Sequence, residues 1–350
     1  MSNTVFVVGA GASKEVKLPT GAELKGKIME LLDFQPTGVW RSELTKGDPE
    51  IWEALNIHTN GKDRNSYRIA ASAIIKALPQ ATSIDNFIYD RDDDKISLCG
   101  KLAIVKSILQ AEKNSRLFFE KSNAESNINF NNLQITWYTP FFRSLIQDCN
   151  KKDKLKERFK SITLIIFNYD RCIEHFIYNG LKNYYDFSDV EAAELVKEIK
   201  IFHPYGDVGT LPWIDGTGAI DFGVEPGAPI LLDLAKNIKT FKEGTDSNSS
   251  KIEEIRKKMG AADRLVFLGF DFHDINMQLI TPLHLGNKEI QNIKCFATAF
   301  DRSKSDIEII RGQIIGLYQS NHRYRDQISM EIEDYVCSQF FEKFRTSLAF

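Results

Sequence analysis

Residues 5–21 of the chain read VFVVGAGASKEVKLPTG. The stretch opens with Val5–Val8, an apolar and mostly β-branched run that favours a strand. This run stops at the glycine-rich sequence Gly9–Ser13. Thr20 and Glu23 then match the Ser/Thr-x-x-Glu capping box with which helices begin. A strand, a glycine-rich loop and a helix in this order predict the first βα unit of an α/β fold.

Five short apolar runs along the chain have strand character, and each is continuous rather than alternating, as in strands buried on both faces. These runs are Thr4–Val8, Ile162–Phe167, Ile199–Phe202, Leu265–Leu268 and Ile293–Ala297. Segments of helical period separate them, the first marked by Leu24, Ile28, Leu31 and Leu32. We therefore expect an α/β fold with a Rossmann-like, largely parallel sheet and helices on both of its faces.

The long stretch between the first βα unit and the second strand has helical spacing and no comparable strand. Helices are expected over Tyr67–Leu78, Ile96–Phe119 and roughly Leu133–Asn150, with Ile84–Ile88 between two of them. We predict a helical insertion module of residues 33–160, packed beside the sheet. Residues 1–32 and 161–350 would then form the Rossmann-like domain.

Charge and composition exclude several classes of protein. The 45 basic and 48 acidic residues give a net charge of -3, which argues against a chain built mainly to coat nucleic acid or an anionic membrane. The N-terminal apolar run is too short for a signal peptide or a membrane span, so we expect a cytoplasmic protein. Its five cysteines form no Cys-x-x-Cys pair, and the histidines show no metal-ligand spacing. We expect reduced thiols and no metal site.

Glycines or polar side chains follow four of the five expected strands. The four stretches are Gly9-Ala10-Gly11-Ala12-Ser13, Asn168-Tyr169-Asp170, His203-Pro204-Tyr205-Gly206 and Gly269-Phe270-Asp271-Phe272-His273-Asp274. In an open parallel sheet, ligands bind beyond the carboxyl ends of the strands, where these loops converge. The sequence therefore predicts one ligand site built from all four loops.

Each candidate also has a purely structural interpretation. Gly9 and Gly11 would let the backbone approach a pyrophosphate, but Lys14 occupies the third glycine position of the dinucleotide fingerprint, so a tight turn is the alternative. His203 lies at a strand end before a proline, which favours a functional role. The alternative is a core histidine satisfied by a backbone carbonyl.

The polar residues near helix starts have capping as their alternative role. Asn168 and Asp170 compete to cap the helix that begins near Arg171. Asp271 and Asp274 would either cap a helix that continues from Ile275 or accept hydrogen bonds from ribose hydroxyls. A further loop, Gly209–Pro229, is rich in Gly and Pro and is typical of a functional lid.

Taken in order, these motifs resemble the sirtuin superfamily, and specifically its prokaryotic sirtuin-like antiviral branch. The matching stretches are GAGAS followed by LPTG, then IIFNYD, IFHPYG and LGFDFHD, and TSIDNFI at 82–88 is similar to a motif of that branch's helical module. Deacetylating sirtuins differ in three respects. They have an Ile-Pro-Asp-Phe-Arg type segment where this chain has Leu18–Gly21, a four-cysteine zinc ribbon, and a Thr-Gln-Asn-x-Asp setting for the asparagine.

The resemblance implies NAD hydrolysis rather than lysine deacylation. Asn168 would orient the ribose or the attacking water, and His203 would act as general base. The pyrophosphate would be held by Gly9, Ala10, Gly11 and Ser13, and the further NAD-binding residues would be Asp170, Gly269 and, on the adenosine side, Asp271 or Asp274. NAD is then the substrate, and no metal or other cofactor is needed.

The resemblance also implies a biological setting and partners. The protein would be the effector of an anti-phage abortive-infection system that depletes NAD in the infected cell. A homo-oligomer is expected, with a HerA-type ring ATPase or another phage-sensing subunit as a possible partner. The helical insertion and a C-terminal helix over Glu331–Ser347 would be the contact surfaces. The alternatives are a non-catalytic sensor of NAD or ADP-ribose and a divergent NAD-dependent deacylase.

Overall fold

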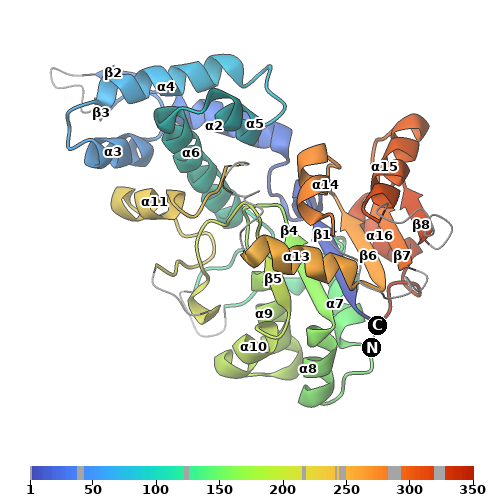
Figure 1. Ribbon diagram of the computed structural model, residues 1–350. Helices are drawn as coiled ribbons and strands as arrows, with labels where there is room; N and C mark the ends of the chain where they lie inside the picture. Colours follow the sequence, from blue (N-terminus) through green and yellow to red (C-terminus); the bar gives the residue numbers. More distant parts are fainter. Residues whose placement is uncertain are drawn as a thin grey trace.

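The computed structural model of the chain describes residues 2–37, 43–121, 126–214, 218–240, 243, 250–282, 293–318 and 328–350. Its centre is a six-stranded sheet of order β5-β4-β1-β6-β7-β8 in which every pair is parallel (Figure 1). The strands are β1 (Thr4–Val8), β4 (Ile162–Ile166), β5 (Lys200–Phe202), β6 (Arg264–Leu268), β7 (Ile293–Thr298) and β8 (Ile328–Glu333). The predicted α/β fold with a parallel sheet is confirmed.

The register of the central strands brings the candidate loops to one level. Val8, the last residue of β1, aligns with Ile166 of β4 on one side and with Leu268 of β6 on the other. The chain leaves β1 toward β4 and leaves β6 toward β7, so the strand order reverses between β1 and β6. In open parallel sheets this switch point is where ligands bind.

Alternate residues of each central strand point to opposite faces of the sheet, and each face carries its own core. Val5 and Val7 of β1 belong to one core cluster, whereas Phe6 and Val8 belong to the other. The predicted continuous apolar runs are thus explained, because both faces are buried.

Helices cover both faces, as predicted (Figure 1). The cluster with Val5 includes residues of α2 (Gly21–Leu32), α3 (Pro49–His58), α4 (Arg64–Ala77), α5 (Ile84–Arg91), α6 (Asp94–Lys113), α11 (Ala228–Ala235), α13 (Ser250–Gly260), α14 (Asp274–Ile280) and α15 (Lys304–Gly316). The cluster with Phe6 includes residues of α1 (Ala10–Ser13), η1 (Lys14–Val16), η2 (Phe130–Leu133), α7 (Tyr138–Ile146), α8 (Lys152–Lys160), α9 (Cys172–Tyr185), α10 (Asp189–Val196) and α16 (Cys337–Lys343).

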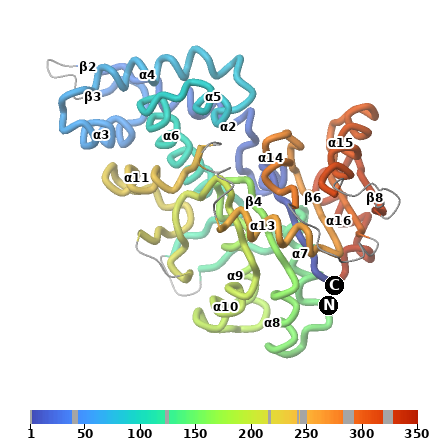
Figure 2. The backbone as a smooth tube through the Cα atoms, in the orientation of Figure 1, coloured from blue at the N-terminus to red at the C-terminus, as the bar shows by residue number. Residues whose placement is uncertain are grey.

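The inserted segment divides between these two faces. The helices α3 to α6 form a lobe at one end of the molecule, with the two-stranded β2 (Pro36–Thr37) and β3 (Glu43–Leu44) at its tip (Figure 2). α2 belongs to this lobe by its contacts with α4 and α6. In contrast, α7 and α8 pack on the face of the sheet that carries Phe6. There Phe141 of α7 lies edge-on to Phe6, with ring centroids 5.2 Å apart.

Local signals account for the elements that were predicted correctly and for those that were not. The Thr20–Glu23 capping box begins α2, as expected. Ile84–Ile88 was expected between two helices but lies in α5, because Ser83 accepts a hydrogen bond from the Asn86 amide and caps it.

Three expected helices are shorter in the structure, and a strand replaces part of one. The helix expected over Ile96–Phe119 ends earlier in the structure, because α6 stops at Lys113. Within the stretch Leu133–Asn150, the α-helix covers only the nine residues of α7. The expected helix over Glu331–Ser347 was wrong at its start, because Glu331 lies in β8 and α16 begins at Cys337. β8 escaped prediction because its exposure alternates along an edge strand.

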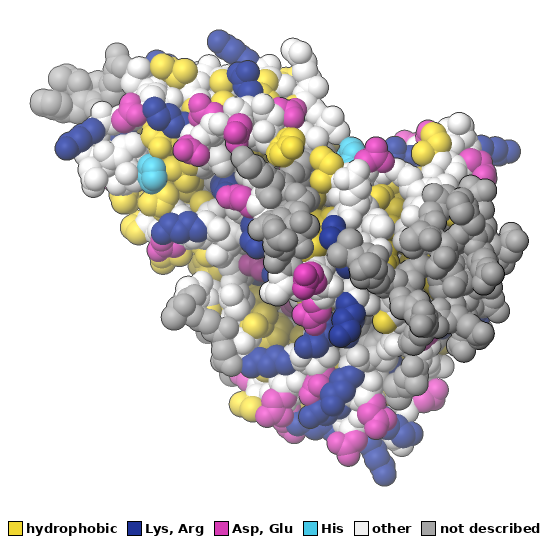
Figure 3. Space-filling model, viewed as in Figure 1, with side chains coloured by type: hydrophobic (Ala, Val, Ile, Leu, Met, Phe, Trp, Pro, Cys, Tyr) yellow, Lys and Arg dark blue, Asp and Glu magenta, His cyan; other side chains and the backbone are white. Residues whose placement is uncertain are grey.

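The charged side chains on the surface are mixed in sign, as the near-zero net charge of the sequence indicates. On the face drawn in Figure 3, basic and acidic side chains are interspersed, and over α8 and α10 they form ion pairs such as Lys152–Glu191 at 3.4 Å. None of the described helices is long and apolar enough to cross a membrane.

Glycine backbones join the loops after β1 and β6 at the switch point. The Gly11 amide donates to the Gly269 carbonyl at 3.0 Å, and the Gly9 amide donates to that of Leu268 at 2.9 Å. A Cβ on Gly9 would lie 2.5 Å from the Gly269 oxygen, and a Cβ on Gly269 would lie 2.1 Å from the Ala12 nitrogen. Gly269 also has φ +52°, a left-handed conformation that favours glycine.

We expect Gly269→Ala to destabilise the fold by more than about 2 kcal/mol, because it combines backbone strain with a clash against Ala12. The matched control is Gly26→Ala in α2, where a Cβ meets open space and a helical alanine stabilises by about 0.5–1 kcal/mol. Urea unfolding of both variants measures the difference. Equal stability of the two variants would contradict the contact.

Candidate active site

Asn168 is the residue that joins the loops after β1 and β4. Its side-chain Nδ2 donates to the Gly9 carbonyl at 3.1 Å and to the Ser13 hydroxyl at 3.0 Å. Its Oδ1 is buried and has no hydrogen-bond partner within the described residues. Asn168 therefore does not cap α9, and its side chain spans the glycine loop while keeping one acceptor atom open.

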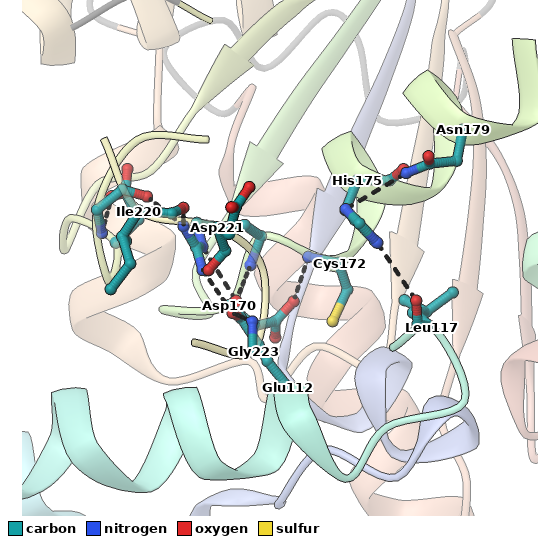
Figure 4. Close-up of polar contacts among 12 residues, drawn as sticks. Glu112, Leu117, Asp170, Cys172, His175, Asn179, Ile220, Asp221 and Gly223 are labelled. Atoms are coloured by element: carbon teal, nitrogen blue, oxygen red, sulfur yellow. Dashed lines mark hydrogen bonds and ion pairs between the residues drawn. The ribbon is translucent and has the colours of Figure 1, made fainter. Parts of the chain in front are cut away.

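Asp170 continues the same network from the other side. The Ser13 hydroxyl donates to Asp170 Oδ2 at 2.9 Å. The Cys172 amide donates to Asp170 Oδ1 at 3.2 Å (Figure 4). Asp170 thus serves the first turn of α9 as well as the glycine loop. Burial raises the pKa of Asp170 above its ordinary value, although these hydrogen bonds oppose the rise.

His203, just beyond β5, has both ring nitrogens engaged. Nδ1 lies 3.1 Å from the Asn168 carbonyl oxygen, and Nε2 lies 2.7 Å from Glu174 Oε1. Burial by itself lowers the pKa of His203, but the Glu174 carboxylate and its hydrogen bond, with Asp207 and the Asn168 carbonyl, raise it to about 9. The contact of Nδ1 with a backbone carbonyl fits the interpretation as a core histidine. The contact of Nε2 with a buried acid fits the functional interpretation.

The predicted residues of the first three loops therefore form one cluster. Ser13, Asn168, Asp170 and His203 are 2%, 7%, 4% and 6% exposed. A buried polar group needs a partner, and these four supply one another with most of theirs. The cluster is therefore largely shielded from solvent in this structure.

Glu174 was missed by the sequence analysis. It lies in the first turn of α9, four residues after Asp170, and it is buried on a helix segment that also buries Ile173 and Phe176. An acidic residue buried on an apolar helix is costly unless it is paired. Its position among apolar residues was the signal available, but its partner beyond β5, His203, could not be identified from the sequence.

The glycine loop has fewer free amides than a phosphate cradle would use. The Gly11 amide is taken by Gly269, and the Ala12 amide donates to the Gly9 carbonyl at 3.0 Å. Ala10 is half-buried at the start of α1. The contacts of Gly9, Gly11 and Gly269 with one another explain these glycines by packing, and a pyrophosphate contact remains a prediction.

Asp271 and Asp274 point to a different part of the surface. Asp271 is paired with Arg302 at 2.8 Å and with His273 at 3.0 Å, and it lines a hollow of about 170 Å³ beside α15. Asp274 accepts a hydrogen bond from Gln313 of α15 at 3.0 Å. Neither caps α14 through its side chain, since His273 is the N-cap residue. Among the described residues, their hydrogen bonds do not reach the Asn168 cluster.

A buried ion pair anchors the loop that follows His203. Arg171 Nη2 lies 2.5 Å from Glu112 Oε2, and Arg171 Nη1 donates to the carbonyls of Gly209 and Ile220 at 3.1 and 2.8 Å. The Gly223 amide donates to Glu112 Oε2 at 3.0 Å (Figure 4). The described parts of the Gly209–Pro229 loop are thus fixed to α6 and α9 by buried polar contacts.

Aromatic stacking reinforces that anchoring. His175 packs flat on Phe222 with ring centroids 4.0 Å apart, and Tyr178 packs on Trp213 at 4.5 Å. Burial lowers the pKa of His175 to about 3, so this histidine is neutral, and its Nε2 donates to the Leu117 carbonyl (Figure 4).

The lobe of α3 to α6 holds the loop after β4 at two alternate residues. The Tyr169 hydroxyl donates to the Asp85 carboxylate of α5, and Arg171 pairs with Glu112 of α6. Asp85 lies within the TSIDNFI stretch. The stretch that resembled a helical-module motif therefore contacts the Asn168–Arg171 loop directly.

Metal ligands and disulfides are not found in the part of the chain that the structure describes. No group of three His, Cys, Asp or Glu residues there could hold a metal ion. All five cysteines are free and buried, as predicted. His284 and His322, for which no metal-ligand spacing was expected, lie outside the described residues.

Comparison with known proteins adds no family. No family model matches the chain, and no curated protein matches it.

The raised pKa of His203 makes stability depend on pH. The proton is bound more tightly in the folded state, so the contribution of His203 is complete below about pH 6.5 and is lost as the pH rises toward about 9. We expect the free energy of unfolding to fall over this window in the unmodified protein. The fall should be smaller in the double variant His203→Gln/Glu174→Gln, which lacks the imidazole and its acidic partner. Parallel pH profiles from denaturant unfolding would contradict the pairing.

Removing one partner of the buried Arg171–Glu112 pair should be strongly destabilising. Glu112→Gln leaves the guanidinium without its counter-charge, and breaking a buried pair in this way costs about 3–5 kcal/mol. The control is Glu30→Gln, which breaks the exposed Lys27–Glu30 pair of 3.0 Å and is expected to change stability by less than about 1 kcal/mol. Urea unfolding distinguishes the two, and similar losses would show that burial does not strengthen the pair.

Proposed function

We propose that this protein is an NAD+ hydrolase that cleaves the bond between nicotinamide and ribose, releasing nicotinamide and ADP-ribose. One observation carries the proposal. Ser13, Asn168, Asp170 and His203 come from three different loops and form one buried, hydrogen-bonded cluster at the carboxyl ends of adjacent parallel strands. Polar residues gathered there, beside the reversal of strand order, are typical of nucleotide sites.

The residues of the cluster suit the chemistry. Cleavage of the nicotinamide–ribose bond develops oxocarbenium character at the anomeric carbon, as in glycoside hydrolysis. Nicotinamide leaves with the bonding electron pair, and water adds to the carbon and loses a proton. Asn168 Oδ1, buried with no partner within the described residues, can accept a hydrogen bond from that water or from a ribose hydroxyl. His203 Nε2 is the atom that would take the proton once it separates from Glu174.

The burial of the cluster fits an enzyme whose activity without a partner is low and rises when a structural change opens the site. The loop carrying Asn168 is held by Asp85 and Glu112 of the helical lobe, so a partner that displaces the lobe would also displace the site. We propose that the protein acts in the cytoplasm as the effector of an anti-phage abortive-infection system. A homo-oligomer, with a HerA-type ring ATPase or another sensing subunit, would provide the control.

A non-catalytic sensor of NAD or ADP-ribose is the second candidate. It is favoured by the engagement of both His203 nitrogens, which leaves no ring nitrogen free to act as a base. A divergent deacylase is disfavoured, because the five cysteines are free and buried rather than gathered in a zinc ribbon.

Chromatography of NAD incubated with the purified protein, without a peptide acceptor, tests the proposal. We expect nicotinamide and ADP-ribose from the unmodified protein. The rate should be at least about 100-fold lower in His203→Ala, since general-base help is worth that much, and also strongly reduced in Asn168→Ala, which loses the group that orients the water or the ribose. His58→Ala and Asn183→Ala, both exposed, are the controls and should retain full activity.

Two further arms separate the candidates. Calorimetry that detects NAD binding without turnover would support the sensor, and absence of binding would contradict both readings of the site. Cleavage that requires an acetyl-lysine peptide would support the deacylase.

A further inference from the structure

The hydrogen bonds around His203 fix where its protons lie. Nδ1 faces the Asn168 backbone carbonyl at 3.1 Å, and a carbonyl oxygen only accepts, so Nδ1 carries a hydrogen. Nε2 is therefore the ring nitrogen whose proton can exchange. This atom lies 2.7 Å from Glu174 Oε1. One proton is thus shared between the imidazole and the carboxylate.

Within the described residues, the Glu174 carboxylate makes its side-chain hydrogen bond to His203. Its Oε2 is buried and has no hydrogen-bond partner within the part of the chain that the structure describes, and both side chains of the pair are 7% exposed. A buried ion pair adds little stability compared with apolar residues of the same size. Its presence at this position is better explained by an effect on the imidazole than by an effect on the fold.

Other charges surround the pair at longer range. Asp207, beyond the same strand end, favours the protonated imidazole. Asp170 and Arg171, on the loop that leads into α9, also interact electrostatically with Glu174, and Arg171 is already paired with Glu112. Glu174 is the acid that contacts the ring directly, so it has the largest favourable influence on its protonation.

We propose that Glu174 is a positioning residue that holds His203 by Nε2 and keeps this nitrogen protonated. His203 then becomes a base only when the pair separates and Nε2 has left its proton on the Glu174 carboxylate or released it to solvent. The inference rests on the proposed NAD hydrolysis for its catalytic consequence. The pairing itself belongs to the resting protein and can be measured without any substrate.

Titration of the His203 ring by NMR tests the pairing, with the resonance assigned by its loss in His203→Gln. The unmodified protein should titrate near 9. In Glu174→Gln the side-chain amide can donate to the neutral Nε2, so the pKa of His203 should fall by more than about 2 units, to 6.5 or below. Glu174→Asp keeps the charge and should retain most of the rise. Asp207→Asn removes only a distant charge and should lower the pKa less.

The pH dependence of kcat/KM for NAD cleavage then tests the catalytic consequence, because this ratio reports the pKa values of the free enzyme. The rising limb should move to lower pH in Glu174→Gln and return toward its original place in Glu174→Asp. Loss of activity with an unmoved limb would mean a merely structural residue and would overturn the inference.

Failure of the inference differs from failure of the proposed function. A His203 pKa that is the same in the unmodified protein and in Glu174→Gln overturns the pairing, even if NAD is cleaved. Absence of NAD cleavage at every pH, with the expected shift in the NMR titration, overturns the proposed hydrolase and the catalytic consequence while leaving the pairing established.

Discussion

The site depends on Asn168, whose side chain and backbone carbonyl bind different loops. Its side-chain amide holds the loop after β1 through Gly9 and Ser13, and its backbone carbonyl accepts from His203 beyond β5. Three loops from neighbouring strands are therefore tied at a single point. The register of β1 and β4 makes this geometry possible, because Val8 and Ile166 end the two strands side by side and the loops that follow them begin at the same level.

The helical lobe is directly coupled to the sheet, because two of its acids, the half-buried Asp85 and the buried Glu112, hold the same loop. Asp85 binds Tyr169 and Glu112 binds Arg171, so the residues on either side of Asp170 are fixed from α5 and α6. Arg171 extends the connection to the carbonyls of Gly209 and Ile220. A displacement of the lobe would break buried polar contacts, and this makes the coupling between lobe and site discrete rather than gradual.

The sequence predicted what local patterns determine and missed what depends on packing in three dimensions. The five strand runs and the convergence of Ser13, Asn168 and His203 followed from apolar runs and from the rule for parallel sheets. The alternating β8 and the acid Glu174 did not, because one lies at an edge and the other is defined by a partner 29 residues away. Asp271 followed the correct strand but turns toward Arg302, a direction that sequence spacing does not encode.

The cluster contains more buried hydrogen-bond acceptors than donors to pair with them. Asn168 Oδ1 and Glu174 Oε2 are both buried acceptors without partners in the described residues, and a buried acceptor left unpaired costs about 1–3 kcal/mol. A ligand that brings hydroxyl donors would relieve this cost, as a ribose or a water does. The two unpaired acceptors therefore destabilise the protein without ligand and would favour binding of a sugar. This links the stability of the site to the chemistry proposed for it.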